Sequence, residues 1–254
     1  MTVAPVIALR PQSSIGSRGE LEVSTALMRG FLGISDGELV ELTAFVNGKA
    51  WVCQCVGADA HVDALRRADS IRGYCGSYML VNGPVDPDLG YRYPRNQWQP
   101  ANNGRATDKD IGTRRAIFVD VDPIRPKGIS STDDQLNAAC DVAHSMREWL
   151  STIVGREAIG LGCSGNGFYL LVALEPEAEP NASTLGVARF LKALGSKYGT
   201  NGVKIDGAVA NPARLMSAPG TWKRKGIDTP ERPHRLTTFS CCGSITRVRL
   251  GDLI

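Results

Sequence analysis

Two acidic residues with a single residue between them end an apolar run in the middle of the chain. The run is IFVDVDP, which places Asp120 and Asp122 just before Pro123. Because side chains alternate across a β-strand, both carboxylates point to the same face, about 7 Å apart. Like charges this close repel one another unless a cation or water screens them. Mg²⁺ and Mn²⁺ prefer oxygen ligands, so the pair predicts a divalent-metal site; the alternative is two solvated acids at an exposed strand end.

A glycine-rich turn further along the chain has the composition of an anion-binding turn. It consists of Ser164, Gly165, Asn166 and Gly167. Glycine permits positive φ and close approach of a ligand to the backbone, and successive N–H groups in such a turn can form a nest for an anion. The Ser164 hydroxyl adds a further donor. The alternative is an ordinary hairpin turn, which Asn166-Gly167 explains alone.

A third acid is followed by basic residues. Asp206 ends the segment VKID, Arg214 lies in NPARL, and Lys223 and Lys225 lie in PGTWKRKG. The guanidinium fork of arginine suits phosphate oxygens. Residues 207–227 contain four basic residues and no acidic one, although the net charge of the whole chain is only +3. Such a basic patch suggests a polyanionic partner, and the alternative is a solvated surface loop.

The composition is that of an ordinary globular protein, able to position these groups. Of the 254 residues, 43% are apolar and 22% are charged, which excludes a disordered chain, a collagen and a coiled coil. No run approaches 18 apolar residues, and the N-terminus lacks a secretory signal. The seven cysteines are an odd number and lie mostly in apolar runs, so we expect a cytoplasmic protein without a disulfide framework.

Periodicity and turn residues predict the elements around the candidate site. Asn47-Gly48 predicts the turn of a hairpin within 38–56, and Thr132 with Gln135 predicts the capped start of a helix that runs to about Leu150. We predict further helices at 59–69 and 184–198, strands at 74–81, 114–122, 158–163, 168–174 and 203–206, a long loop at 82–104 and a closing hairpin over Gly243 from 236–241 and 245–250. The mixed order predicts an α+β fold with a mainly antiparallel sheet and helices on one face.

In chain order, D-x-D, S-G-N-G, I-D with N-P-A-R-L, and P-G-T-x-K-x-K-G resemble the catalytic core of the archaeo-eukaryotic primase superfamily. The sequence is most similar to the primase-polymerase domains of plasmid and phage replication proteins. The resemblance covers about 37–227 and is clearest over 114–226. It implies an RRM-like antiparallel sheet with packed helices plus an N-terminal α/β subdomain. The implied organisation is an N-terminal arm (1–35) and a catalytic domain (36–254), itself divided into an N-terminal subdomain (about 36–110) and an RRM-like part (about 111–254).

The resemblance also implies an activity and roles for individual residues. The protein would extend a primer 3′-hydroxyl with nucleoside triphosphates on a single-stranded DNA template, using two Mg²⁺ or Mn²⁺ ions. The ions would be held by Asp120, Asp122 and Asp206. The incoming triphosphate would be contacted by Ser164, Gly165, Asn166, Gly167, Tyr169, Arg214 and Lys223. No P-loop is present, so a helicase motor acting with it would lie in a longer chain or another protein, and we expect no membrane partner and the cytoplasm of a bacterium or phage-infected host.

Tyr169 departs from the family pattern, because the second motif normally carries a histidine at this position. A phenol can donate one hydrogen bond to a phosphate but carries no positive charge near neutral pH, so Arg214 or a lysine would have to supply that charge. This departure motivates a second hypothesis, a catalytically silent nucleic-acid-binding module of the same fold. A third hypothesis is a metal-dependent nuclease that uses the same carboxylates.

Overall fold

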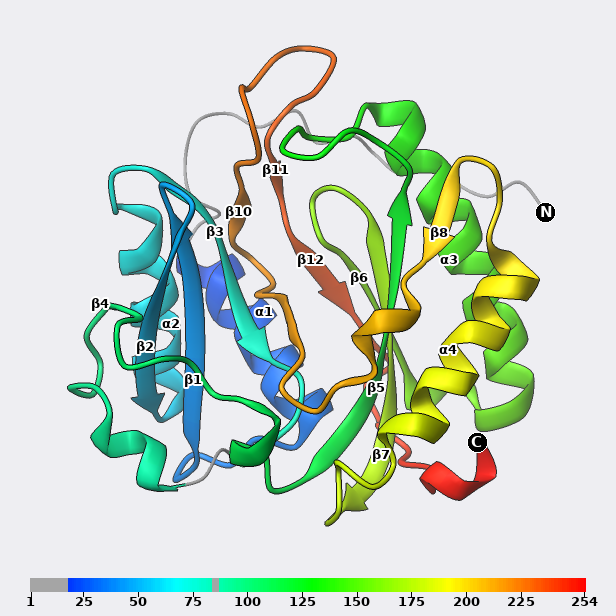
Figure 1. The fold of residues 1–254 in the computed structure, drawn as a ribbon, viewed down its shortest axis with the longest axis horizontal. Helices are drawn as coiled ribbons and strands as arrows, with labels where there is room; N and C mark the ends of the chain where they lie inside the picture. Colours follow the sequence, from blue (N-terminus) through cyan, green and yellow to red (C-terminus); the bar gives the residue numbers. More distant parts are fainter. Residues whose placement is uncertain (1–17, 84–86) are drawn as a thin grey trace.

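Two five-stranded antiparallel sheets lie side by side in the molecule (Figure 1). The computed structural model describes residues 18–83 and 87–254. Sheet 1 has the strand order β4-β2-β1-β3-β9, and each neighbouring pair is antiparallel. Its strands are β1 (Leu39–Val46), β2 (Lys49–Val56), β3 (Tyr74–Leu80), β4 (Gln99–Pro100) and β9 (Leu215–Ser217).

Sheet 2 has the strand order β12-β6-β7-β5-β8 and is also antiparallel throughout. Its strands are β5 (Arg114–Pro123), β6 (Ile159–Cys163), β7 (Phe168–Glu177), β8 (Val203–Ile205) and β12 (Thr238–Ser240). A short ribbon of β10 (Trp222–Lys223) and β11 (Arg235–Leu236) runs between the two sheets (Figure 1).

The helices cover one side of each sheet. They are α1 (Arg18–Leu32), α2 (Ala58–Asp69), α3 (Asp133–Val154) and α4 (Thr184–Tyr198). Helix α2 packs on β1, β2 and β3, α3 packs on β5, β6 and β7, and α4 packs beside β8. Helix α1 contacts both α2 and β12, with the ring of Phe31 edge-on to Phe239 at 5.3 Å. One hydrophobic core therefore extends through both sheets.

The predicted hairpin turn and two of the predicted helices are confirmed. Asn47 and Gly48 have φ of 48° and 76° in the tight turn between β1 and β2, as a type I′ hairpin requires. The helices predicted at 59–69 and 184–198 correspond to α2 and α4. The turn and the two helices were predictable because the residues within each segment favour the conformation that the segment adopts in the fold.

Helix α3 begins as predicted and runs four residues further than predicted. The Thr132 hydroxyl accepts the N–H of Gln135 at 3.2 Å, and the Gln135 side chain accepts the N–H of Thr132 at 3.0 Å. These reciprocal bonds satisfy two N–H groups that the first helical turn leaves free. The helix ends at Gly155, whose φ of 80° suits a residue without a Cβ.

The predicted closing hairpin over Gly243 is wrong. Part of its first arm forms β12, which pairs with β6 of sheet 2. The second arm forms no partner strand; Val248 makes a single parallel bridge with Leu174. Alternating apolar residues identified a strand, but its partner was set by the free edge of β6, where Phe239 can bury its ring against Phe31.

The predicted arm at 1–35 includes residues 1–17, which lie outside the described residues. Residues 18–32 form α1, whose buried Leu21 and Met28 make it part of the core. The α+β class with antiparallel sheets and packed helices is confirmed, whereas the RRM-like and primase folds stay predictions. A division of the chain near residue 110 also stays a prediction, although β9 from beyond that point completes sheet 1.

None of the helices within residues 18–83 and 87–254 has the length and apolarity needed to cross a bilayer.

Candidate active site

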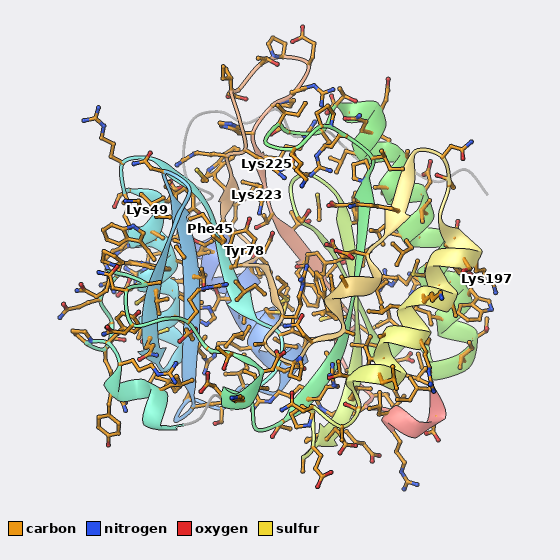
Figure 2. All side chains as sticks on the ribbon, viewed as in Figure 1. Phe45, Lys49, Tyr78, Lys197, Lys223 and Lys225 are labelled. Carbon is orange, nitrogen blue, oxygen red and sulfur yellow. The ribbon has the colours of Figure 1, made fainter. Side chains whose placement is uncertain are left out.

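A polar pocket lies between the two sheets and receives side chains from both. Sheet 2 contributes acidic and amide groups, and sheet 1 contributes Tyr78 of β3 and the residues of β9. Basic side chains come from Arg125, Arg214, Lys223 and Lys225. Figure 2 shows Tyr78, Lys223 and Lys225 in the region between the sheets. The pocket thus combines groups that are far apart in the sequence.

Asp120 and Asp122 lie on the pocket face of β5, as the alternation predicted. Both line the pocket, whereas Val121 between them is fully buried in the core. Asp120 is opposite Tyr169 of β7, and Asp122 is opposite Lys204 of β8. The strand therefore positions two partly buried carboxylates on one surface, with apolar anchoring on the other.

Asp206 lies beside Asp120, although it is not part of the pocket lining. Its N–H donates to the Asp120 carbonyl at 3.1 Å, which continues the antiparallel register of β5 and β8. Its carboxylate accepts the N–H of Ala208 at 2.9 Å and caps a short 3₁₀ turn. The sheet thus places the backbone of Asp206 beside that of Asp120, and Asp122 lies two residues further along β5.

Burial, and after it the nearby negative charges of Asp122 and Asp206, raise the pKa of Asp120 to about 7. The guanidinium of Arg214 acts in the opposite direction. A carboxyl in these surroundings favours either a proton or a cation beside it. The surrounding positive charges therefore do not fully compensate the negative charge of an ionised Asp120.

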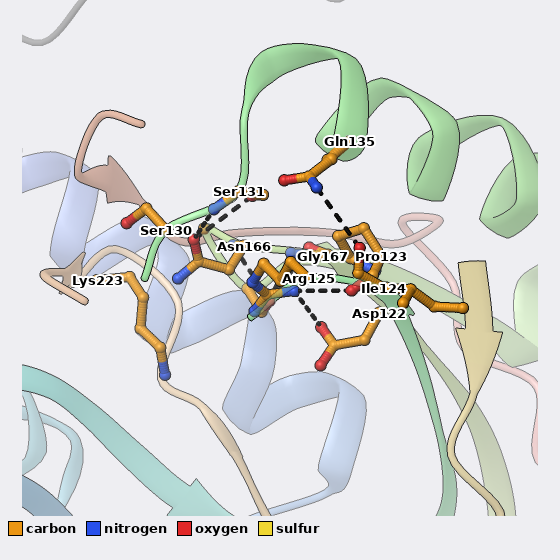
Figure 3. A network of polar contacts seen from close by, with 12 residues as sticks. Asp122, Pro123, Ile124, Arg125, Ser130, Ser131, Gln135, Asn166, Gly167 and Lys223 are labelled. Atoms are coloured by element: carbon orange, nitrogen blue, oxygen red, sulfur yellow. Dashed lines mark hydrogen bonds and ion pairs between the residues drawn. The ribbon is translucent and has the colours of Figure 1, made fainter. Parts of the chain in front are cut away.

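Asp122 is held between Arg125 and a glycine. Arg125 Nη1 lies 3.7 Å from Asp122 Oδ1, a long ion pair that leaves 30% of the Asp122 side chain exposed (Figure 3). A Cβ at Gly167 would lie 2.5 Å from the same oxygen and 2.7 Å from the Val121 carbonyl. Only glycine fits at position 167, because a side chain there would collide with the Asp122 carboxylate.

The backbone of the Ser164–Gly167 turn is largely engaged with itself. The Ser164 hydroxyl accepts the N–H of Gly167 at 3.1 Å and that of Asn166 at 3.5 Å, and Gly165 N–H contacts the Cys163 sulfur at 3.4 Å. The Ser164 N–H donates to the Gly167 carbonyl at 2.9 Å. The turn therefore presents to the pocket the side chains of Ser164 and Asn166 rather than an open nest of N–H groups.

Asn166 is buried and has one unsatisfied donor. Its Oδ1 accepts the N–H of Ser131 at 2.9 Å, which fixes the orientation of the amide (Figure 3). Its Nδ2 is buried and makes no hydrogen bond within the described residues. A buried amide donor without a partner is costly, so this atom is suited to a ligand oxygen.

The basic groups of the pocket have few anionic partners. Arg214 Nε is buried and makes no hydrogen bond to the part of the chain that the structure describes. Burial lowers the pKa of Lys223 to about 7, and it lowers the pKa of Lys225 as well. These cations line the same pocket as the carboxylates of Asp120 and Asp122, so the pocket can receive both an anion and a cation.

Tyr169 forms part of the pocket floor and is completely buried. Its ring lies near those of Phe118 and Phe239, at centroid distances of 5.5 and 6.4 Å. A Cβ at Gly162 would overlap this ring, so the glycine makes room for it. The hydroxyl has no hydrogen-bond partner among the described residues, and burial raises the pKa of the phenol well above its ordinary value.

The carboxylates of the pocket suit a divalent-cation site that water and substrate complete, rather than one in which protein side chains supply every ligand. In the described part of the chain, no three His, Cys, Asp or Glu side chains are grouped closely enough to hold a metal ion by themselves. Mg²⁺ typically takes one or two carboxylates and completes its shell with water and substrate phosphates. Asp120 and Asp122, with Asp206 adjacent, fit that pattern.

Sequence reasoning did not identify Tyr78, Ser217 or Arg125 as site residues, yet all three line the pocket. Tyr78 and Ser217 are opposite one another in sheet 1, a pairing with no signature in the sequence. Arg125 had a local signal, because it follows the D-x-D by three residues. No protein-family model matches the chain, and no curated protein matches it significantly.

Proposed function

We propose that this protein is a primase-polymerase that joins nucleoside triphosphates to a primer 3′-hydroxyl on a single-stranded DNA template. The observation that supports this most strongly is the presence of acidic and basic side chains in one pocket. Asp120 and Asp122 of β5 line this pocket together with the basic side chains of Arg214, Lys223 and Lys225. Phosphoryl transfer needs mainly positioning and charge neutralisation, and such a pocket can provide both.

Asp120 and Asp122 would hold the divalent ions, and Asp206, whose backbone pairs with that of Asp120, would add negative charge beside them. When bound, two Mg²⁺ or Mn²⁺ ions supply charge that activates the 3′-hydroxyl and stabilises the departing pyrophosphate. Arg214 and Lys223 would neutralise the triphosphate. Asn166 would donate to a phosphate oxygen through its Nδ2–H, for which the described part of the chain offers no acceptor.

The basic segment 214–225, which contains the edge strand β9 of sheet 1 and β10, would bind the phosphate backbone of the template. Binding that depends on Lys and Arg contacts to phosphates weakens as salt rises. We accordingly propose single-stranded DNA, a primer and nucleoside triphosphates as partners, in the cytoplasm of a bacterium or a phage-infected host. A helicase motor on the same longer chain or on another protein would supply the opened template.

The second candidate is a nucleic-acid-binding module without turnover. The burial of Tyr169 favours it, because a phenol in an apolar environment stays neutral and contributes no charge to triphosphate binding. Both proposals predict DNA binding. They differ in whether the chain incorporates nucleotides.

The test is extension of a labelled primer on single-stranded DNA with nucleotides and Mg²⁺ or Mn²⁺. We expect the wild-type protein to lengthen the primer and the Asp120→Ala/Asp122→Ala variant to lose activity by more than a hundredfold. The matched control is Asp141→Ala/Asp252→Ala, which removes two exposed acids outside the pocket and should retain activity.

Three outcomes would decide against the proposal. Full activity in the Asp120/Asp122 double variant would eliminate the metal-dependent polymerase. DNA binding without incorporation by the wild-type protein would support the silent module. Metal-dependent shortening of the DNA would indicate a nuclease.

A further inference from the structure

The side chain of Lys223, in the β10–β11 ribbon between the sheets, passes between two glycines, one from the β6–β7 turn and one from β3. A Cβ at Gly165 in the β6–β7 turn would lie 2.7 Å from Lys223 Cβ, and one at Gly76 in β3 would lie 3.2 Å from Lys223 Cδ. Glycine at both positions leaves the space that the lysine chain occupies. The direction of Lys223 is therefore set by the backbone on either side of it.

The ammonium group of Lys223 ends among neutral partners. It donates a hydrogen bond to the Tyr78 hydroxyl, and it lies 3.5 Å from the Ser217 hydroxyl. It also lies 3.8 Å from the centre of the Tyr78 ring, where the aromatic face attracts a cation. None of these groups carries a negative charge, and a buried ammonium without an anion is unfavourable.

Tyr78 and Ser217 are themselves held in place. They are directly opposite in the pairing of β3 with β9. The ring of Phe45 meets that of Tyr78 edge-on, with centroids 5.3 Å apart. Figure 2 shows Phe45 and Tyr78 on sheet 1, on the side toward Lys223. The two hydroxyls thus come from sheet 1, whereas the carboxylates of Asp120 and Asp122 come from sheet 2.

We infer that Tyr78 and Ser217 are positioning residues that aim the Lys223 ammonium at an anionic polyphosphate in the pocket. Sheet 1 then completes a site whose acids stand on sheet 2. The remaining cations favour an anionic ligand, because Arg214 Nε has no hydrogen-bond partner within residues 18–83 and 87–254 and Lys225 lines the same pocket. The inference rests on the proposed function in taking the polyphosphate to be that of a nucleoside triphosphate.

The experiment uses Tyr78→Phe, which keeps the ring and its contact with Phe45 but removes the hydroxyl that receives the lysine. Titration calorimetry with inorganic tripolyphosphate measures binding without turnover. We expect a three- to tenfold weaker affinity, on the order of one lost hydrogen bond. In nucleotide incorporation the variant should raise KM more than it lowers kcat. Tyr91→Phe, at a tyrosine that is 87% exposed, is the matched control and should match the wild type.

A double-mutant cycle separates positioning from a general structural effect. In a Lys223→Met background, Tyr78→Phe should cause no further loss of tripolyphosphate affinity, because its effect acts through the lysine. Ser217→Ala provides a second entry into the same cycle if Tyr78→Phe does not fold. Unchanged affinity in both hydroxyl variants, or an equal loss with and without Lys223, would overturn the inference.

The results also distinguish this inference from the proposed function. Coupled loss of tripolyphosphate binding in a protein that never extends a primer would leave the inference standing and refute the polymerase. Primer extension with the same KM for nucleotide in wild type and Tyr78→Phe would support the polymerase and refute the inference about Tyr78. A wild-type protein that binds no tripolyphosphate would overturn the inference.

Discussion

Replacing Asp120 by asparagine should stabilise the protein at alkaline pH. Burial and the neighbouring acids raise the pKa of Asp120 from 3.8 to about 7. The folded protein then keeps a proton that the unfolded chain releases, so this carboxyl costs increasing stability as the pH rises from about 4 to about 7. Asparagine has nearly the same shape and no charge at any pH. Its advantage over the wild type should therefore grow through that window and stay constant above it.

The magnitude follows from the shift and from the surroundings of the carboxyl. A rise of about three pKa units corresponds to at most about 4 kcal/mol. Water reaches the partly exposed end of β5 and screens the repulsion, so we expect about 1–2 kcal/mol at pH 8. For a chain of this length that is a rise of about 3–6 °C in Tm.

Thermal unfolding at pH 4.5 and pH 8 measures the effect directly. Asp141→Asn, which neutralises an exposed acid on α3, is the matched control and should show no such growth. Added Mn²⁺ at pH 8 should raise the Tm of the wild type and have a smaller effect on Asp120→Asn, because the cation relieves the same repulsion. An advantage that is equal at both pH values, or a loss of stability at pH 8, would refute the reasoning.

Three further substitutions test the parts of the site separately. Gly167→Ala places a Cβ 2.5 Å from an Asp122 oxygen, so it should lower the free energy of unfolding by about 1–3 kcal/mol in urea titrations and reduce nucleotide incorporation. Thr132→Ala removes the hydroxyl cap of α3 and should cost about 1 kcal/mol without changing tripolyphosphate affinity in calorimetry. Asn166→Asp keeps the oxygen that accepts the Ser131 N–H but replaces the Nδ2 donor, which has no partner among the described residues, by a negatively charged oxygen. This variant should bind tripolyphosphate at least tenfold more weakly than the wild type. The control Asn137→Asp, on the exposed face of α3, should bind it as the wild type does.

Much of the fold followed from local patterns, because those elements depend on neighbouring residues. The I′ turn at Asn47-Gly48 and the capping box of Thr132 are examples. The alternation in IFVDVDP also predicted correctly that Asp120 and Asp122 share a face. In each case the determining contacts lie within a few residues.

The features that were missed depend on contacts between distant parts of the chain. The pairing of β3 with β9 brings Tyr78 beside Ser217, and no local pattern identifies that partner. The incorrect closing hairpin has the same origin, since β12 pairs with β6. The engagement of the Ser164–Gly167 backbone with its own side chain was likewise not evident from the residue types.

The most direct test of the proposed site is a crystal structure of the protein with Mn²⁺ and a non-hydrolysable nucleoside triphosphate. We predict anomalous density for Mn²⁺ within coordination distance of Asp120 and Asp122 oxygens, with the triphosphate between those ions and Lys223. Manganese or nucleotide bound elsewhere, with these carboxylates free of metal, would contradict the account.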